Sequence, residues 1–188
     1  MDHGEYARAR DTVLREISTT VAAVDENDVR KLIDAITGAE AVFFVGVGRV
    51  LLALEAFAKR LAHLGIRAIV VGEITEPAIT EHDVLIVGSG SGESVVSLAI
   101  ARRAKEFGAT VVHIGANPDS SITAIADQFV RIPTSTKLQL PGEPTSEQPM
   151  TSLFDQSLLI IGDVIALLLI QQSGQDLVGL WRNHANLE

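Results

Sequence analysis

The sequence predicts a single α/β domain, a three-layer sandwich with helices on both faces of a five-stranded parallel sheet in the flavodoxin-like order 2-1-3-4-5. Short, continuously apolar runs alternate with longer segments of helical periodicity. Such runs are typical of strands that are buried on both faces of a parallel sheet. The length of 188 residues suits one domain, which we take as residues 1–188.

Two amphipathic helices open the chain and together form an N-terminal part over residues 1–38. The first is predicted at 6–24 and the second at 27–36, where Gly38 can end it. Neither carries an evident reactive group, so we expect them to serve packing or subunit contact.

The alternating elements occupy residues 39–132, and a final helix follows. In order, we predict a strand at 41–45, a helix at 49–64, strands at 66–71 and 84–88, a helix at 93–107, a strand at 110–114, a short helix at 121–126, a strand at 128–132 and a helix at 151–172. Right-handed crossovers would connect the parallel strands. In the predicted order, the loops after strands 1 and 3 meet at the switch point where ligands bind.

The segment 133–150 contains four prolines and many polar residues, which exclude regular structure. Loops of this length are often functional or mobile. The helix at 151–172 is apolar nearly all round, so we expect it to be buried, partly in a subunit interface.

Composition and charge exclude several classes of function. The net charge is -9 and no basic tract is present, so nucleic acid is not an expected partner. The absence of cysteine excludes disulfides and thiolate chemistry. The N-terminal segment has no signal-like apolar core, and the apolar run 158–170 is shorter than the roughly 20 residues of a membrane span. We therefore expect a cytoplasmic protein without membrane partners.

The segment Gly88-Ser89-Gly90-Ser91-Gly92-Glu93-Ser94 is the most informative motif. Glycines allow successive backbone N–H groups to converge on an anion, and the N-terminus of the following helix faces the same place. We predict that Ser89, Gly90, Ser91 and Ser94 bind a phosphate group. The alternative is a tight turn with a serine N-cap. No Walker pattern follows, which disfavours nucleotide triphosphate hydrolysis.

A second glycine motif, Gly46-Val47-Gly48-Arg49, follows the first strand. It could open a dinucleotide-binding fingerprint, but position 51 is Leu rather than the third glycine. Glu73, just past the second strand, could act as the ribose-binding acid of that fold. A dinucleotide-dependent oxidoreductase therefore stays open as an alternative. That function would leave the segment 88–94, which we call the serine-rich loop, unexplained.

Carboxylates would be needed for proton transfer next to a carbonyl group. Asp155 lies in the first turn of the last helix, although Ser152 and Asp155 also resemble a capping box. Glu93 is a second candidate for this chemistry, although we expect it at a helix start, where it would stabilise the dipole. Asp163 lies in mid-helix, and we expect it to make a buried polar contact.

Three histidines are weaker candidates. His63 shares a polar helix face with Arg49 and Arg60, which suits solvent or a subunit interface. His113 lies within a strand and is expected in the core or at the strand end. His184 lies in the C-terminal tail and is expected to be incidental.

Together these residues resemble the SIS (sugar isomerase) family, and within it the 6-phospho-3-hexuloisomerase branch. The matching stretches run through most of the chain: GVGR at 46–49, KRLAHLG at 59–65, VVGE at 70–73, SGSGES at 89–94, KLQLPGEPTSEQPMTSLFDQ at 137–156 and NHANLE at 183–188. The SGSGE motif marks the SIS group, and the LPGEP…QPM…SLF stretch narrows the resemblance to the branch.

The resemblance implies an isomerase of the ribulose monophosphate pathway that interconverts D-arabino-3-hexulose 6-phosphate and fructose 6-phosphate through an enediol, without a metal or redox cofactor. It implies that Ser89, Ser91 and Ser94 hold the phosphate. Gly46, Gly48, Arg49 and Glu93 would line the sugar. Asp155 would be the base. It also implies a homotetramer whose active sites are completed by neighbouring subunits, with His63 as one such contribution.

Three positions depart from the branch pattern. Val50 stands where Ser is usual, Ser94 where Thr is usual, and Asp155 where Glu is usual. The alternatives are therefore an isomerase of a different phosphosugar and a sugar-phosphate sensing module of the kind found in regulators.

Overall fold

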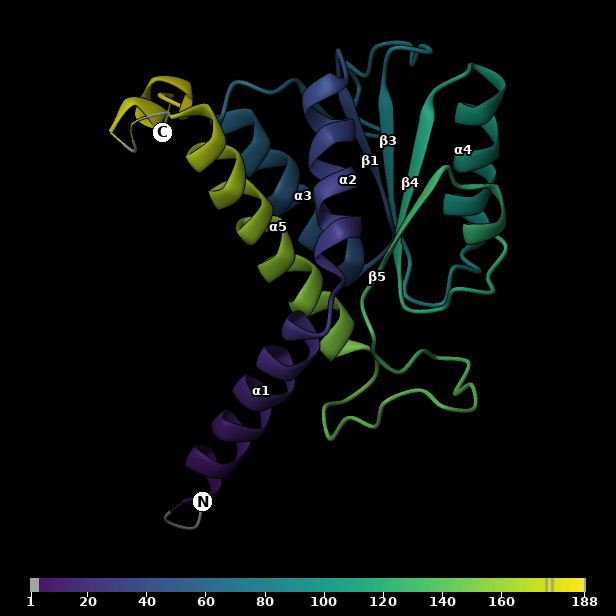
Figure 1. Ribbon diagram of the computed structural model, residues 1–188, viewed down its shortest axis with the longest axis vertical. Coiled ribbons are helices and arrows are strands. Elements are labelled where there is room, and N and C mark those ends of the chain that lie inside the picture. The colour runs from purple at the N-terminus through teal and green to yellow at the C-terminus, as the bar shows by residue number, and fades with distance from the viewer. Residues whose placement is uncertain (1–3, 175, 177, 188) are drawn as a thin grey trace.

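A five-stranded parallel sheet forms the centre of the computed structural model, which describes residues 4–174, 176 and 178–187 (Figure 1). Its strands lie in the order β2-β1-β3-β4-β5, which confirms the predicted order and fold class. The strands are β1 Val42–Val45, β2 Ala68–Val70, β3 Val84–Gly88, β4 Thr110–Gly115 and β5 Gln128–Arg131. Each neighbouring pair runs parallel.

Helices cover both faces of the sheet. They are α1 Glu5–Ala22, α2 Glu26–Gly38, α3 Arg49–His63, α4 Val95–Glu106 and α5 Ser152–Ser173, with short 3-10 turns η1 Thr123–Ile125 and η2 Gly179–Asn183. One face, which includes Phe44 and Ile86, packs against α2, α3 and α5. The other, which includes Phe43 and Leu85, packs against α4 (Figure 1). Alternate strand residues thus enter separate cores, which explains why the strands are apolar throughout.

Two helix boundaries differ from the sequence prediction. The helix expected from Glu93 begins at Val95, with Ser94 as its N-cap residue. Gly92 has φ +68, and the Glu93 carboxylate accepts a hydrogen bond from the Ser121 N–H at 2.8 Å. This tertiary contact holds Glu93 outside the helix. The short helix expected at 121–126 is the single 3-10 turn η1.

The segment 133–150 has no helix or strand, as predicted, but it is anchored to α1. In Figure 1 this segment lies beside α1, and the N-terminal end of α1 projects away from the sheet. The buried carboxylate of Glu16 accepts hydrogen bonds from Ser146 Oγ at 2.7 Å, the Glu147 N–H at 2.9 Å and Gln148 Nε2 at 3.0 Å. These contacts hold the pKa of Glu16 below its usual value, although burial acts in the opposite direction.

Helix α5 is long and apolar enough to cross a membrane by length and composition, but 56% of its most apolar window is buried inside the domain. Core packing therefore explains most of its composition. An exposed apolar row remains on its outer side, formed by Leu159, Ile160, Val164 and Leu167. The expectation that Asp163 makes a buried contact is wrong. Its side chain is 54% exposed and pairs with Arg60 Nε at 3.1 Å.

Candidate active site

Hydrogen bonds to four successive carbonyl groups, from Ser89 to Gly92, fix the orientation of the loop between β3 and α4. The donors come from residues 113–122. Ser89 O accepts from His113 Nε2, Gly90 O from the Ala116 and Asn117 N–H groups, Ser91 O from Asn117 Nδ2, and Gly92 O from the Ile122 N–H. Because the Ser89 and Gly90 carbonyls face this segment, the N–H groups of Gly90 and Ser91, in the same peptide units, point to the opposite side. The Ser89 N–H itself donates to Ile114 O at 3.1 Å.

Several donors of the loop are available to a ligand. Among the residues that the structure describes, no acceptor is bonded to the N–H groups of Gly90, Ser91 or Ser94. The hydroxyl oxygens of Ser89, Ser91 and Ser94 each accept a hydrogen bond, from Gly92 N, Glu93 N and Ser97 Oγ respectively. Each hydroxyl therefore keeps its own hydrogen to donate. Such a set of convergent donors suits an anion without needing a positive charge.

Close packing explains why glycine stands at particular positions of this loop. A Cβ atom at Gly88 would lie 2.8 Å from side-chain carbons of both Val50 and Leu54. A Cβ atom at Gly46 would likewise lie 3.3 Å from the Val50 side chain and 3.0 Å from the Leu54 side chain. The loops after β1 and β3 therefore meet at one place, as the switch-point argument predicts. Val50 packs between them.

An ion pair lies beside these loops. Arg49 Nε donates to Asp155 Oδ2 at 3.1 Å, from a side chain that is 65% exposed to one that is 7% exposed. Burial raises the pKa of Asp155, and the bond to Arg49 opposes this rise. In the described part of the chain, the buried Asp155 Oδ1 has no partner. Asp155 thus has one oxygen held by Arg49 and one available.

The capping-box interpretation of Asp155 is wrong. The N-cap residue of α5 is Thr151, which makes no side-chain cap hydrogen bond, and the Asp155 carboxylate turns to Arg49 instead. The neighbouring Phe154 ring lies against Gly90, whose Cβ position is 3.4 Å from the ring. This contact brings the first turn of α5 to the serine-rich loop.

Glu93 does not stabilise the start of α4 as expected, because it is held outside the helix by Ser121. The hydrogen bonds from Ser121 lower the pKa of Glu93. A contact between Glu93 and a sugar stays a prediction.

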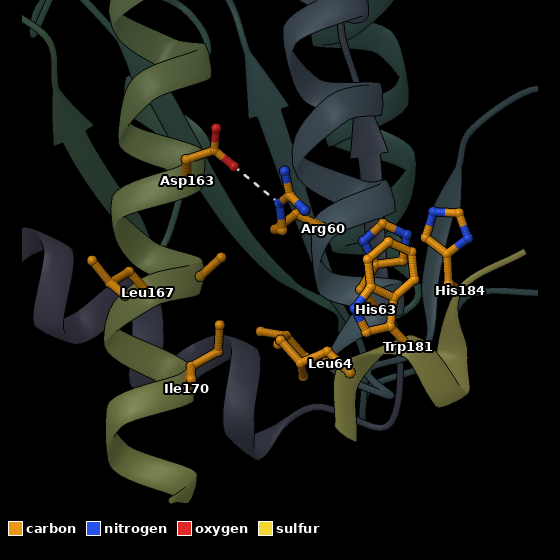
Figure 2. A pocket seen from close by; sticks show the side chains of 10 residues that line it. Arg60, His63, Leu64, Asp163, Leu167, Ile170, Trp181 and His184 are labelled. Carbon is orange, nitrogen blue, oxygen red and sulfur yellow. Dashed lines mark hydrogen bonds and ion pairs between the residues drawn. The ribbon is translucent and has the colours of Figure 1, made fainter. Parts of the chain in front are cut away.

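His63 lies at the end of α3 that is far from Arg49 and Asp155, where it lines a pocket of its own (Figure 2). The 14 residues from Arg49 to His63 span about 21 Å of helix. The pocket has a volume of about 390 Å³ and is lined by Arg60, His63, Leu64, Asp163, Ala166, Leu167, Ile170, Leu180, Trp181 and His184. A single chain therefore does not bring His63 to Asp155.

The C-terminal tail forms one wall of this pocket. The His184 ring stacks on the His63 ring with centroids 5.2 Å apart, and Trp181 lies 5.0 Å from His184 (Figure 2). Burial lowers the pKa of His63, and nearby Lys59 and Arg60 lower it further. His184, expected to be incidental, thus packs against the histidine that the resemblance singles out.

The chain is similar to a known protein family over most of its length. Residues 35–162 match the SIS domain family. The 3-hexulose-6-phosphate isomerase of Bacillus subtilis is 39% identical over 94% of this chain and 95% of its own length. That of Mycobacterium gastri is 37% identical over 92% of this chain and 86% of its own. A crystal structure of a Methanococcus jannaschii protein, from which a 3-hexulose-6-phosphate isomerase function was inferred, superposes with a TM-score of 0.83 at 28% identity, covering 96% and 99% of the two chains.

Proposed function

Because the chain belongs to the SIS domain family, we propose that it is a 6-phospho-3-hexuloisomerase that interconverts D-arabino-3-hexulose 6-phosphate and fructose 6-phosphate. The family and its named relatives make it a sugar phosphate isomerase. The substrate pair, its place in the ribulose monophosphate pathway and a cytoplasmic location belong to the proposal.

One observation carries the proposal: the outward N–H groups of Gly90 and Ser91 lie close to the buried Asp155 carboxylate, one of whose oxygens has no partner among the residues that the structure describes. The loop would bind the phosphate through Gly90, Ser91 and Ser94. Asp155 would face the reacting carbons, and Phe154 joins the two parts through its contact with Gly90. Binding energy from the remote phosphate would thereby orient the carbon chain against the base.

The reaction needs only proton transfers. With the carbonyl group at C3, the Asp155 carboxylate removes the proton from C2, and the electrons of the C–H bond form a C2–C3 double bond. The displaced carbonyl electrons stay on the C3 oxygen, which takes up a proton from solvent to give a cis-enediol. Return of a proton to C3 and loss of the hydroxyl proton at C2 place the carbonyl group at C2. The raised pKa of Asp155 strengthens it as a base. Arg49, largely exposed beside Asp155, would stabilise negative charge on the enediol oxygens.

A coupled assay tests the assignment. Ribulose 5-phosphate, formaldehyde and hexulose-phosphate synthase generate the substrate, and fructose 6-phosphate is measured. Asp155→Asn should lower kcat at least about 100-fold. Asp34→Asn, which alters an exposed carboxylate on α2, should leave it unchanged. Absence of product with the unaltered protein would refute the proposal, and tight sugar-phosphate binding without turnover would favour a sensing module.

We further propose that the active sites are completed within a homotetramer, with His63 acting at a neighbour's site. The exposed apolar row on α5 runs from near the Asp155 end into the pocket of His63, which Leu167 also lines. Antiparallel pairing of two α5 helices near Ile160 would cover this row. It would also set the pocket beside Asp163 and Leu167 against the Asp155 end of the other copy.

Subunit mixing tests this arrangement. Asp155→Asn and His63→Asn proteins should each be inactive alone. Refolded together in equal amounts, they should regain about a quarter of the activity. Half of the random pairs are hybrids, and one of the two sites in each hybrid has both Asp155 and His63 intact. Size-exclusion chromatography with light scattering should give a tetramer. Activity that does not return on mixing would contradict a shared site, and a monomer would contradict the assembly.

A further inference from the structure

His113 lies beneath the serine-rich loop and takes no part in the proposed proton transfers. It is fully buried, on β4, in register with Val87 of β3. Its Nε2 lies 2.9 Å from the carbonyl oxygen of Ser89, and its Nδ1 lies 2.8 Å from Thr123 Oγ1. A histidine flanked by Val112 and Ile114 in the strand thus contacts the first residue of the loop.

The partners of His113 determine its protonation. A carbonyl oxygen only accepts, so Nε2 carries the hydrogen and donates it to Ser89. Burial lowers the pKa of His113 to about 4, so the ring is neutral near pH 7 and Nδ1 must accept. Thr123 therefore donates its hydroxyl hydrogen to Nδ1, in preference to the Asn117 carbonyl oxygen at 3.2 Å. The Ser120 hydroxyl, 2.9 Å from Thr123 Oγ1, donates in turn.

The packing around this chain of hydrogen bonds leaves little room for another arrangement. A Cβ atom at Gly115 would lie 2.4 Å from His113 Nε2, and one at Gly92 would lie 1.9 Å from Ser120 Oγ. Both glycines allow the loop and the ring to approach each other. Glu93 is the charged group that acts on the ring, and Phe129 lies 5.2 Å from it.

We propose that neutral His113 is a positioning residue for phosphate binding: by holding the Ser89 carbonyl inward, it turns the N–H groups of the serine-rich loop toward the anion. The proposal rests on the phosphate-binding role proposed for that loop. His113 itself does not touch the substrate. The competing interpretation is a buried histidine that contributes to stability alone.

Three variants separate the two interpretations. His113→Leu removes the donor to Ser89, whereas the side-chain amide of His113→Gln can replace it. Val112→Ala is the matched control, because Val112 is equally buried on the same strand but faces the other core. The measurements are the Kd for inorganic phosphate by calorimetry, KM and kcat for the sugar phosphate, and Tm.

His113→Leu should weaken phosphate binding about tenfold, the effect of one lost hydrogen bond of about 1.4 kcal/mol. KM should rise by a similar factor with kcat within about threefold, because the remaining donors of the loop still orient the phosphate of the bound substrate. His113→Gln should recover most of the affinity. Val112→Ala should lower Tm without changing Kd. Equal Kd values for His113→Leu and the unaltered protein would overturn the proposal.

Two further measurements keep the proposal testable. If His113→Leu does not fold, Thr123→Val removes the hydroxyl that orients the ring and should weaken phosphate binding severalfold. An unchanged Kd for this variant would overturn the proposal.

If the unaltered protein binds no phosphate, the proposed function of the loop fails. Hydrogen exchange of the Gly92 N–H, bonded to Ser89, then decides the positioning role. Faster exchange in His113→Leu than in Val112→Ala would support it, and equal exchange would overturn it.

Discussion

Acidification below pH 6.5 is expected to weaken the fold chiefly through His113. Burial lowers the pKa of this histidine from its ordinary value of 6.5 to about 4. Between these values the unfolded chain binds a proton that the folded chain does not, so stability falls as the pH falls. The contribution is fully present above pH 6.5 and fully lost below about pH 4. At about 1.4 kcal/mol for each pKa unit, the whole effect is about 3 kcal/mol.

About 2 kcal/mol of this loss should occur between pH 7 and pH 5. The carboxylates respond at lower pH. Glu16 and Glu93 have lowered pKa values, so their contribution is lost only as the pH falls below their ordinary value of 4.5. His63 also has a lowered pKa and titrates in the same range as His113. A variant of His113 is therefore needed to isolate its share.

The assay is urea unfolding of the unaltered protein and His113→Gln at pH 7, 6 and 5. Whatever its stability at pH 7, the variant should lose about 2 kcal/mol less on going to pH 5 than the unaltered protein. His63→Asn should keep most of the pH dependence. Parallel loss of stability in His113→Gln and the unaltered protein would refute the reasoning, because the buried ring would then not be the group that binds the proton.

Three other changes have defined outcomes. Glu16→Gln should make the segment 133–150 severalfold more sensitive to limited proteolysis, because the charged group that accepts three hydrogen bonds is lost. An unchanged rate of cleavage would contradict the anchoring role of Glu16. Gly92→Ala should lower stability by at least about 1 kcal/mol more than Gly142→Ala, since both have positive φ but only Gly92 lacks room for a Cβ atom; equal Tm losses would contradict this. Arg49→Gln should raise the pKa of Asp155 and move the acidic limb of the pH–rate profile upward, and a downward shift would argue against their pairing.

The sheet could be predicted from the sequence because its strands are buried on both faces. Val42–Val45 and Val84–Gly88 are fully buried, so each reads as a continuous apolar run. Element ends were less predictable because they depend on distant residues. Glu93 has good local reasons to start a helix, but its bond to Ser121, 28 positions along the chain, keeps it out.

Residues of the candidate site could be predicted where a local sequence motif identifies them. They could not be predicted where strand register or helix phase determines which residues meet. The serine-rich loop and Arg49 follow from glycine motifs at strand ends. Asp163 was placed wrongly because α5 is apolar nearly all round, and its composition does not reveal which side meets solvent. The contact between His113 and Ser89 depends on the β3–β4 register, which no local pattern specifies.

The glycines of the serine-rich loop have a packing function that weakens their value as a phosphate signal. Gly88 makes room for Val50 and Leu54, and Gly92 makes room for Ser120, whereas a Cβ atom at Gly90 would only touch the Phe154 ring at 3.4 Å. Packing would therefore require glycine at positions 88 and 92 even in a loop that bound nothing. The stronger argument for an anion is the direction of the backbone, because the carbonyls from Ser89 to Gly92 are bonded to residues 113–122, which leaves the N–H groups of Gly90 and Ser91 facing outward. The segment that follows β4 is therefore as much a part of the proposed phosphate site as the loop itself.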